Sequence, residues 1–124
     1  MPELPEVETI VKELRTKITD EVFSGFEPLW QRSFVGDNDL TLINRQIKNI
    51  SRKGKFILIE LDKGYLLTHL RMTGQLIVMD SLPDNRNHLR IIFKFVSGKY
   101  LLFFDLRKFG RIYLVQDLNT VVGS

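Results

Sequence analysis

From residue 47 onward, short apolar segments recur about every ten residues, and this regularity constrains the fold more than any other feature of the chain. Seven segments are expected to be strands: 47–52, 56–61, 65–70, 75–79, 88–96, 100–106 and 111–115. Asp62-Lys63-Gly64 and Ser97-Gly98-Lys99 lie between neighbouring segments, and short polar glycine-containing tripeptides are typical of hairpin turns. The pattern predicts an antiparallel sandwich or barrel.

The beginning of the chain follows a different period. Its apolar residues lie on one face of a predicted helix: Val7, Ile10, Val11, Leu14 and Ile18. A further strand is expected over 22–30, and a short apolar helix or turn over 40–47. The predicted fold class is therefore α+β, an antiparallel β-sandwich of about eight strands flanked by an N-terminal helix and a second short helix.

Composition sets limits on function. The 124 residues suffice for one domain, with 44% hydrophobic and 27% charged residues, as in soluble globular proteins. Without cysteine, neither a disulfide nor a cysteine-based zinc site can form. No apolar run approaches the length of a membrane span, and the acidic N-terminus is unlike a secretion signal, so a cytoplasmic location is expected by default.

Positive charge is concentrated in a few segments. The net charge is +3, and basic residues gather in the middle and near the end of the chain: Arg45, Lys48, Arg52, Lys53, Lys55, Arg107, Lys108 and Arg111. Such turns can present a positive face to DNA phosphates. The alternative is that these side chains merely solvate strand surfaces.

The first residues, Met1-Pro2-Glu3-Leu4-Pro5-Glu6, offer a possible covalent mechanism. If Met1 is removed, the nitrogen of Pro2 becomes a secondary amine, and Glu3 beside it can donate a proton. If Met1 is retained, that nitrogen is an amide and no nucleophile exists. The ordinary structural alternative is a helix start, because Pro5 suits a first turn and acidic residues complement the helix dipole.

Four motifs in order resemble the formamidopyrimidine-DNA glycosylases, over essentially the whole chain. They are Pro-Glu-Leu-Pro-Glu-Val-Glu-Thr at residues 2–9, Ser-Arg-Lys-Gly-Lys-Phe at 51–56, Thr-His-Leu-Arg-Met-Thr-Gly at 68–74 and Asp-Leu-Arg-Lys-Phe-Gly at 105–110. The resemblance implies removal of oxidised purines, such as 8-oxoguanine and formamidopyrimidines, from double-stranded DNA. A Schiff base on the N-terminal proline then leads to strand cleavage at the abasic site (AP-lyase activity).

The resemblance also assigns roles to individual residues. Pro2, Glu3 and Lys55 are the expected catalytic set: Pro2 attacks C1′, Glu3 protonates the sugar ring oxygen, and Lys55 contacts a phosphate beside the lesion. Glu6 is expected to support this site. The expected DNA-binding residues are His69, Met72, Arg86, His88, Arg107 and Phe109.

Two of these expectations concern the opening in the duplex. Arg107 would enter the gap left by the flipped base, Phe109 would wedge beside it, and Met72 would fill the vacated space, since apolar side chains there offset part of the cost of unstacking. Arg107 and Phe109 are two residues apart, so in an extended backbone their side chains would point the same way. Taken alone, Met72 would more often be a core residue and His69 a satisfied sheet histidine.

The chain also departs from the family pattern. Leu106 and Lys108 replace a proline and an arginine of the family motif, and Arg86-Asn87-His88 stands where His-Asp-His is common. We expect residues 1–124 to form a single N-terminal catalytic domain, without the family's helix-two-turn-helix and zinc-finger domain. No metal or other cofactor is therefore expected in this chain, which we expect to be a monomer. The alternative function is a catalytically silent truncated domain or DNA-binding remnant.

Overall fold

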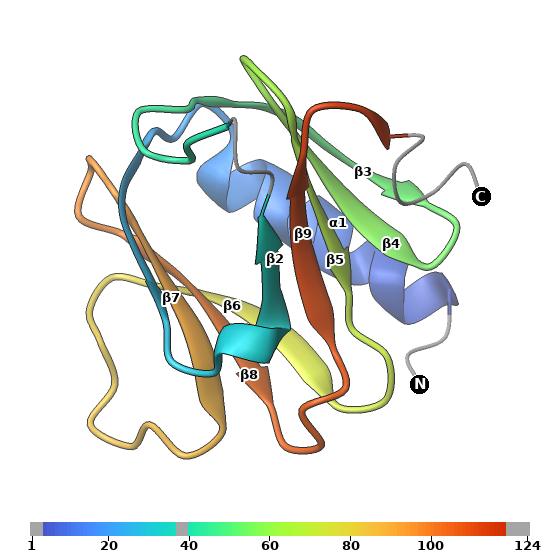
Figure 1. Ribbon diagram of the computed structural model, residues 1–124, viewed down its shortest axis with the longest axis vertical. Coiled ribbons are helices and arrows are strands. Elements are labelled where there is room, and N and C mark those ends of the chain that lie inside the picture. Colours follow the sequence, from blue (N-terminus) through green and yellow to red (C-terminus); the bar gives the residue numbers. More distant parts are fainter. Residues whose placement is uncertain (1–3, 37–39, 119–124) are drawn as a thin grey trace.

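Two β-sheets pack face to face in the computed structural model, which describes residues 4–36 and 40–118 (Figure 1). The five-stranded sheet has the order β2 (Phe34–Gly36), β9 (Arg111–Val115), β5 (Tyr65–His69), β4 (Phe56–Leu61), β3 (Ile47–Lys53). The four-stranded sheet has the order β1 (Phe23–Pro28), β7 (Leu89–Phe95), β8 (Tyr100–Asp105), β6 (Gly74–Met79). Every pair is antiparallel except β2 with β9, which are parallel.

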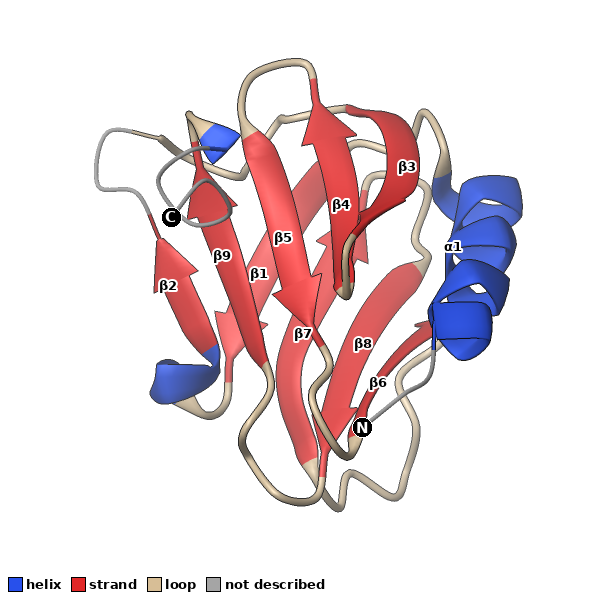
Figure 2. Cartoon of the chain, turned by 90° about the vertical axis from the view of Figure 1, so that its right-hand side faces the viewer, coloured by secondary structure: helices blue, strands red, loops and turns tan. Residues whose placement is uncertain are grey.

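The helix α1 (Leu4–Ile18) closes one side of the sandwich, where it packs on the edge strands β3 and β6 (Figure 2). Its buried residues are Val7, Val11, Leu14 and Ile18, the stripe that the helical spacing predicts. On the same helix, the guanidinium of Arg15 donates from Nε and Nη2 to the carbonyl oxygen of Ile50, at 3.0 and 2.7 Å. This contact also covers an acceptor on the edge strand β3.

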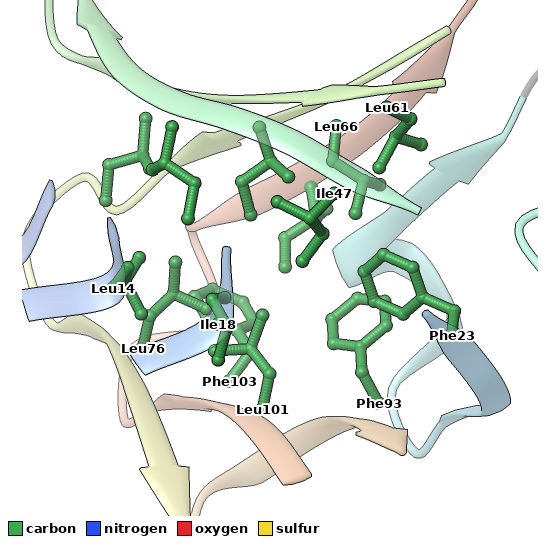
Figure 3. Packing of buried hydrophobic residues seen from close by; sticks show 14 of the residues in the cluster. Leu14, Ile18, Phe23, Ile47, Leu61, Leu66, Leu76, Phe93, Leu101 and Phe103 are labelled. Atoms are coloured by element: carbon green, nitrogen blue, oxygen red, sulfur yellow. The ribbon is translucent and has the colours of Figure 1, made fainter. Parts of the chain in front are cut away.

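The core between the sheets is mostly aliphatic near α1, where Phe103 lies beside Ile18, and it is aromatic toward β1 (Figure 3). Phe23 and Phe93 are fully buried, and their ring centroids lie 5.7 Å apart in an edge-to-face arrangement. Phe95 also contacts Phe23, with centroids at 4.9 Å. Burial of these side chains removes a large apolar area from water, which is the main favourable contribution to folding.

Most of the predicted elements are confirmed, with two differences. The segment 40–47, expected to be a short helix or a turn, is a turn in which the Arg45 amide donates to the Leu42 carbonyl at 3.0 Å. Leu40 and Leu42 both point into the core, so their spacing of two is that of an extended segment. The short helix is instead η1, a single 3₁₀ turn at Gln31–Ser33. The three-residue strand β2 was not predicted from the sequence, because it is too short to show a period.

No helix in the part of the chain that the structure describes is long and apolar enough to cross a membrane.

The contrast between two phenylalanines tests this description of the core. We expect Phe93→Ala to lower the free energy of unfolding by about 3–5 kcal/mol, because it leaves a cavity among buried rings. Phe109→Ala makes the same chemical change at a side chain that is 47% exposed, and should cost about 1 kcal/mol or less. Urea denaturation of both variants measures the difference. Phe93→Leu, which leaves a smaller void, serves if Phe93→Ala does not fold. Equal losses at positions 93 and 109 would contradict the fold.

Candidate nucleic-acid interface

The turn between β5 and β6 (70–73) and the loop between β8 and β9 (106–110) lie at the same end of the sandwich. Figure 2 shows both connections at its lower end. The pairing of β5 with β9 and of β6 with β8 brings the two loops together, because each loop joins one sheet to the other. Residues from two of the sequence motifs therefore meet here.

A buried carboxylate joins the two loops. Asp105 ends β8 and is only 1% exposed. Its Oδ2 accepts a hydrogen bond from the Gly110 amide at 2.7 Å, and its Oδ1 accepts one from the Thr73 hydroxyl. The Thr73 oxygen in turn accepts a bond from the Arg107 amide at 2.9 Å. A buried carboxylate is tolerated only with such partners, so the charge fixes the shape of both loops.

Two glycines allow this close approach. A Cβ on Gly110 would lie 2.7 Å from the Phe103 ring and 2.9 Å from Asp105 Oδ2. A Cβ on Gly74 would lie 2.6 Å from the Leu70 carbonyl oxygen, which is also the acceptor for the Gly74 amide. Because backbone and buried side-chain atoms occupy these positions, only glycine fits at the ends of both loops.

A hollow of about 430 Å³ opens between the loops and the outer face of the five-stranded sheet. Its lining residues are His69, Arg71, Met72, Phe109, Arg111 and Tyr113. Met72 is 52% exposed and Phe109 is 47% exposed. Large apolar side chains left open to water beside two arginines mark a binding surface rather than a core. Met72 and Phe109, both expected from the sequence to contact DNA, therefore line the same hollow.

Arg107 and Phe109 also come together, but not in the way that the sequence predicts. Their segment is a bend rather than an extended strand, and Lys108 between them has a left-handed backbone with φ of 61°. The Arg107 guanidinium nevertheless lies over the Phe109 ring, 5.2 Å from its centroid. A cation–π contact, rather than strand alternation, places the two side chains side by side.

His69 lines the hollow at the end of β5, and Lys55 lies in the turn that precedes β4. Lys55 follows Gly54 in the exposed turn between β3 and β4, and its neighbour Phe56 is paired with His69 in the register of β4 and β5. The rings of Phe56 and His69 are in edge contact, with centroids 5.0 Å apart. The third and second motifs of the sequence are therefore adjacent in space.

The charge state of His69 follows from these neighbours. Burial lowers the pKa of His69 below its ordinary value of 6.5, and the positive charges of Arg71 and Lys55 lower it further. Its Nδ1 is buried and has no hydrogen-bond partner among the described residues. At neutral pH the imidazole is therefore uncharged. An anion bound nearby would raise the pKa of His69 and so oppose the effect of the two cations.

One guanidinium links α1 to the turn that carries Lys55. Arg52 donates from Nε to Glu8 Oε1 at 2.6 Å and from Nη1 to the Gly54 carbonyl at 2.8 Å. The hydrogen bond and charge of Arg52 lower the pKa of the Glu8 carboxyl below its ordinary value of 4.5. Glu8 is therefore ionised at neutral pH and the link is intact.

The remaining predicted residues lie elsewhere. Pro2 and Glu3 lie outside the described residues, and Glu6 is exposed in the first turn of α1. Arg86 donates from Nε to the Pro83 carbonyl at 3.3 Å within its own loop. His88 is exposed with φ of 68°, and its carbonyl accepts a bond from the Asp105 amide at 2.8 Å. Neither Arg86 nor His88 lines the hollow, so the DNA contacts expected of them would lie outside it.

Several residues of this surface were not singled out from the sequence as site residues. Arg71, Arg111 and Tyr113 line the hollow, and Asp105 and Thr73 connect its two loops. Four of these five stand within or next to the motifs 68–74 and 105–110. The available signal was therefore the motif itself, whereas Tyr113 carries no signal other than the alternation of β9.

Among residues 4–36 and 40–118, no group of three or more His, Cys, Asp or Glu side chains lies close enough to hold a metal ion. The chemistry available at this surface comes from cations, aromatic rings and one imidazole.

The titration of His69 tests this electrostatic picture. We expect NMR of the imidazole to give a pKa below 6.5. Because His69 is protonated more easily in the unfolded chain, its contribution lowers the free energy of unfolding as the pH falls below 6.5. Lys55→Met and Arg71→Met should each raise the pKa, while Lys63→Met, in the hairpin at the other end of β5, should not. A His69 pKa at or above 6.5 would contradict the arrangement.

Comparison with known proteins identifies this arrangement. A family model described as the formamidopyrimidine-DNA glycosylase N-terminal domain matches residues 1–112. The chain is 36% identical over 129 aligned residues to formamidopyrimidine-DNA glycosylase of Protochlamydia amoebophila, covering 99% of this chain and 47% of the relative. It is 38% identical to that of Pelotomaculum thermopropionicum, covering 93% of this chain and 44% of the relative.

The same family has the same fold. The Lactococcus lactis enzyme bound non-covalently to DNA with an AP site superposes with a TM-score of 0.87 at 29% identity, over 98% of this chain and 48% of that chain. The chain spans about half the length of the relatives it matches. On the extent of the family match and the shared fold, the chain belongs to the formamidopyrimidine-DNA glycosylase family and corresponds to its N-terminal domain.

Proposed function

We propose that residues 1–124 are the N-terminal catalytic domain of a DNA glycosylase and AP lyase that removes oxidised purines from double-stranded DNA. The observation that carries the proposal is the hollow bordered by Met72, Phe109 and Arg107, next to the turn that carries Lys55. Relatives of this family have been solved on DNA with an AP site and on DNA with a FAPY-dG lesion. These structures support DNA as the ligand of the surface.

The arrangement suits a duplex from which one nucleotide has been flipped out. Extruding a base costs a few kcal/mol of stacking and pairing, and apolar side chains inserted into the stack recover part of it. Met72 and Phe109 are exposed and side by side at the hollow, while Arg107 offers donors to the unpaired base. The arginines at 71 and 111 add positive charge for the backbone.

The covalent step would use Pro2. Its free nitrogen attacks C1′ of the damaged nucleoside, the C1′–base bond breaks, and the oxidised base leaves with the proton that the Pro2 nitrogen loses as the new C1′–N bond forms. Glu3 protonates the ring oxygen, which opens the sugar to an iminium on Pro2. The iminium makes a C2′ proton acidic, and its loss expels the 3′ phosphate by β-elimination. Lys55 would hold a phosphate beside the lesion as a point charge.

Arg52 supports this assignment from the structure of the described residues. Glu8 lies in α1, a few residues after Pro2 in the chain, and Gly54 is next to Lys55. The bonds from Arg52 to both therefore couple the start of the helix to the phosphate-binding turn. A nucleophile and a phosphate contact gain rate only when they are held in a fixed relation.

The second candidate is a domain that keeps the fold and binds DNA without turnover. The relatives are about twice as long as this chain, so their activity does not by itself establish turnover by these residues.

Borohydride trapping distinguishes the two candidates. The protein without Met1 is incubated with a duplex containing an abasic site and borohydride, which reduces an iminium to a stable amine. Intact mass should show the protein joined to the oligonucleotide, and an acetylated N-terminus should abolish the adduct. Lys55→Met should slow trapping at equal DNA concentration, whereas Lys63→Met should not. Absence of an adduct on protein that has lost Met1 would refute catalysis by this chain.

A further inference from the structure

The corner after β1 lies against the β8–β9 loop through the only tryptophan of the chain. The Lys108 ammonium lies over the Trp30 ring, 4.5 Å from its centroid. The indole Nε1 is buried and has no hydrogen-bond partner among the described residues. Within the described residues, the Trp30 ring is therefore held by packing and by the cation–π contact with Lys108, without a hydrogen bond from the indole nitrogen.

A second link joins the same corner to the base of the loop. The amides of Leu29 and Trp30 both donate to the Arg90 carbonyl, at 2.7 and 3.1 Å. Arg90 Nε in turn donates to the Asp105 carbonyl at 2.9 Å. The backbone that carries Trp30 is thus fixed relative to the residue from which the loop begins.

Lys108 is held from both directions. Its side chain lies on Trp30, and its carbonyl accepts a bond from Arg111 Nη1 at 2.8 Å. Its left-handed backbone, with φ of 61°, turns the chain between Arg107 and Phe109. Arg107 and Phe109 contact each other, and Phe109 lines the hollow. Lys108 between them points to the other side, where it contacts Trp30. A non-glycine residue keeps this conformation only where its surroundings fix it.

We propose that Trp30 and Lys108 are positioning residues, which hold Arg107 and Phe109 in the pose that distinguishes the base opposite the lesion. The inference rests on the proposed function, because it concerns the same DNA contact. Lys108 stands where the family motif has an arginine, and either cation can stack on an indole. Trp30 lies outside all four motifs, so the sequence alone did not indicate it.

The contact itself is tested without DNA. Since Trp30 is the single tryptophan, acrylamide quenching of its fluorescence reports how well the ring is covered. We expect Lys108→Ala to increase the quenching constant by about twofold, because the ring loses the side chain over it. Lys108→Arg should retain the wild-type value, and Lys63→Ala, a matched change in an exposed hairpin, should leave it unchanged. Equal quenching in Lys108→Ala and wild type would overturn the contact.

The positioning role is tested with two duplexes that carry an abasic site opposite cytosine or opposite adenine. We expect Lys108→Ala and Trp30→Leu to reduce the ratio of the two affinities by about fivefold, the smaller end of the discrimination that one base contact provides. Lys108→Arg, which keeps a cation over the indole, should keep the wild-type ratio. Trp30→Phe, which keeps an aromatic ring, replaces Trp30→Leu if the latter does not fold.

Two results would overturn the proposal. If Lys108→Ala weakens binding to both duplexes equally and Trp30→Leu changes neither affinity, Lys108 is a phosphate contact and Trp30 has no part in it. If the wild-type chain binds both duplexes with the same affinity, it does not distinguish the opposite base, and Trp30 and Lys108 have no such role. Failure of the wild type to bind either duplex would refute the proposed function as well, and the quenching result would then stand as a structural contact alone.

Discussion

The candidate surface depends on the hydrogen bonds that the buried carboxylate of Asp105 accepts from two loops. This carboxylate lies at the end of a central strand, is almost fully buried, and accepts bonds from a hydroxyl in one loop and an amide in the other. A carboxyl group in such a place is costly to bury unless its oxygens are satisfied, so the two loops have little freedom to separate. Arg107, Phe109 and Met72 are presented to solvent from loops held in this way.

The sandwich combines a tightly packed interior with exposed apolar side chains at one end. The interior supplies a packed support of aliphatic and aromatic side chains, while the end of the sandwich leaves apolar side chains open beside arginines. Met72 and Phe109 remain about half exposed, so they contribute less to folding than buried side chains do, and their placement fits the proposed contact with DNA. Under that proposal, stacked bases would meet the apolar side chains and phosphates would meet the arginines. The family to which the chain belongs gives this ligand independent support.

Much of the fold could be predicted from local patterns. The helix followed from the spacing of Val7, Val11, Leu14 and Ile18, and the hairpins followed from glycine turns, because these depend on neighbouring residues only. The strand β2 could not be predicted, since it exists only through its parallel pairing with β9. The choice between helix and turn at 40–47 could not be made from the sequence either, because Leu42 is buried by distant segments.

The candidate site divides in the same way. Met72, Arg107 and Phe109 were predicted from motifs, and the structure brings them to one surface. The burial of Asp105 and the stacking of Lys108 on Trp30 could not be predicted, because both depend on loops that meet only in the folded chain. Asp and Lys are ordinarily exposed, so their types alone point to solvent.

Hydrogen exchange at the Gly110 amide tests the central claim most directly. If Asp105 holds the loops together, this amide should be protected in the wild type. Asp105→Ala should speed its exchange by about tenfold or more, as expected for the loss of one charge-assisted bond. The amides of Ile112 and Leu114 in β9 should change less, because their protection comes from the sheet. An unprotected Gly110 amide in the wild type, or equal exchange in the two proteins, would contradict the account.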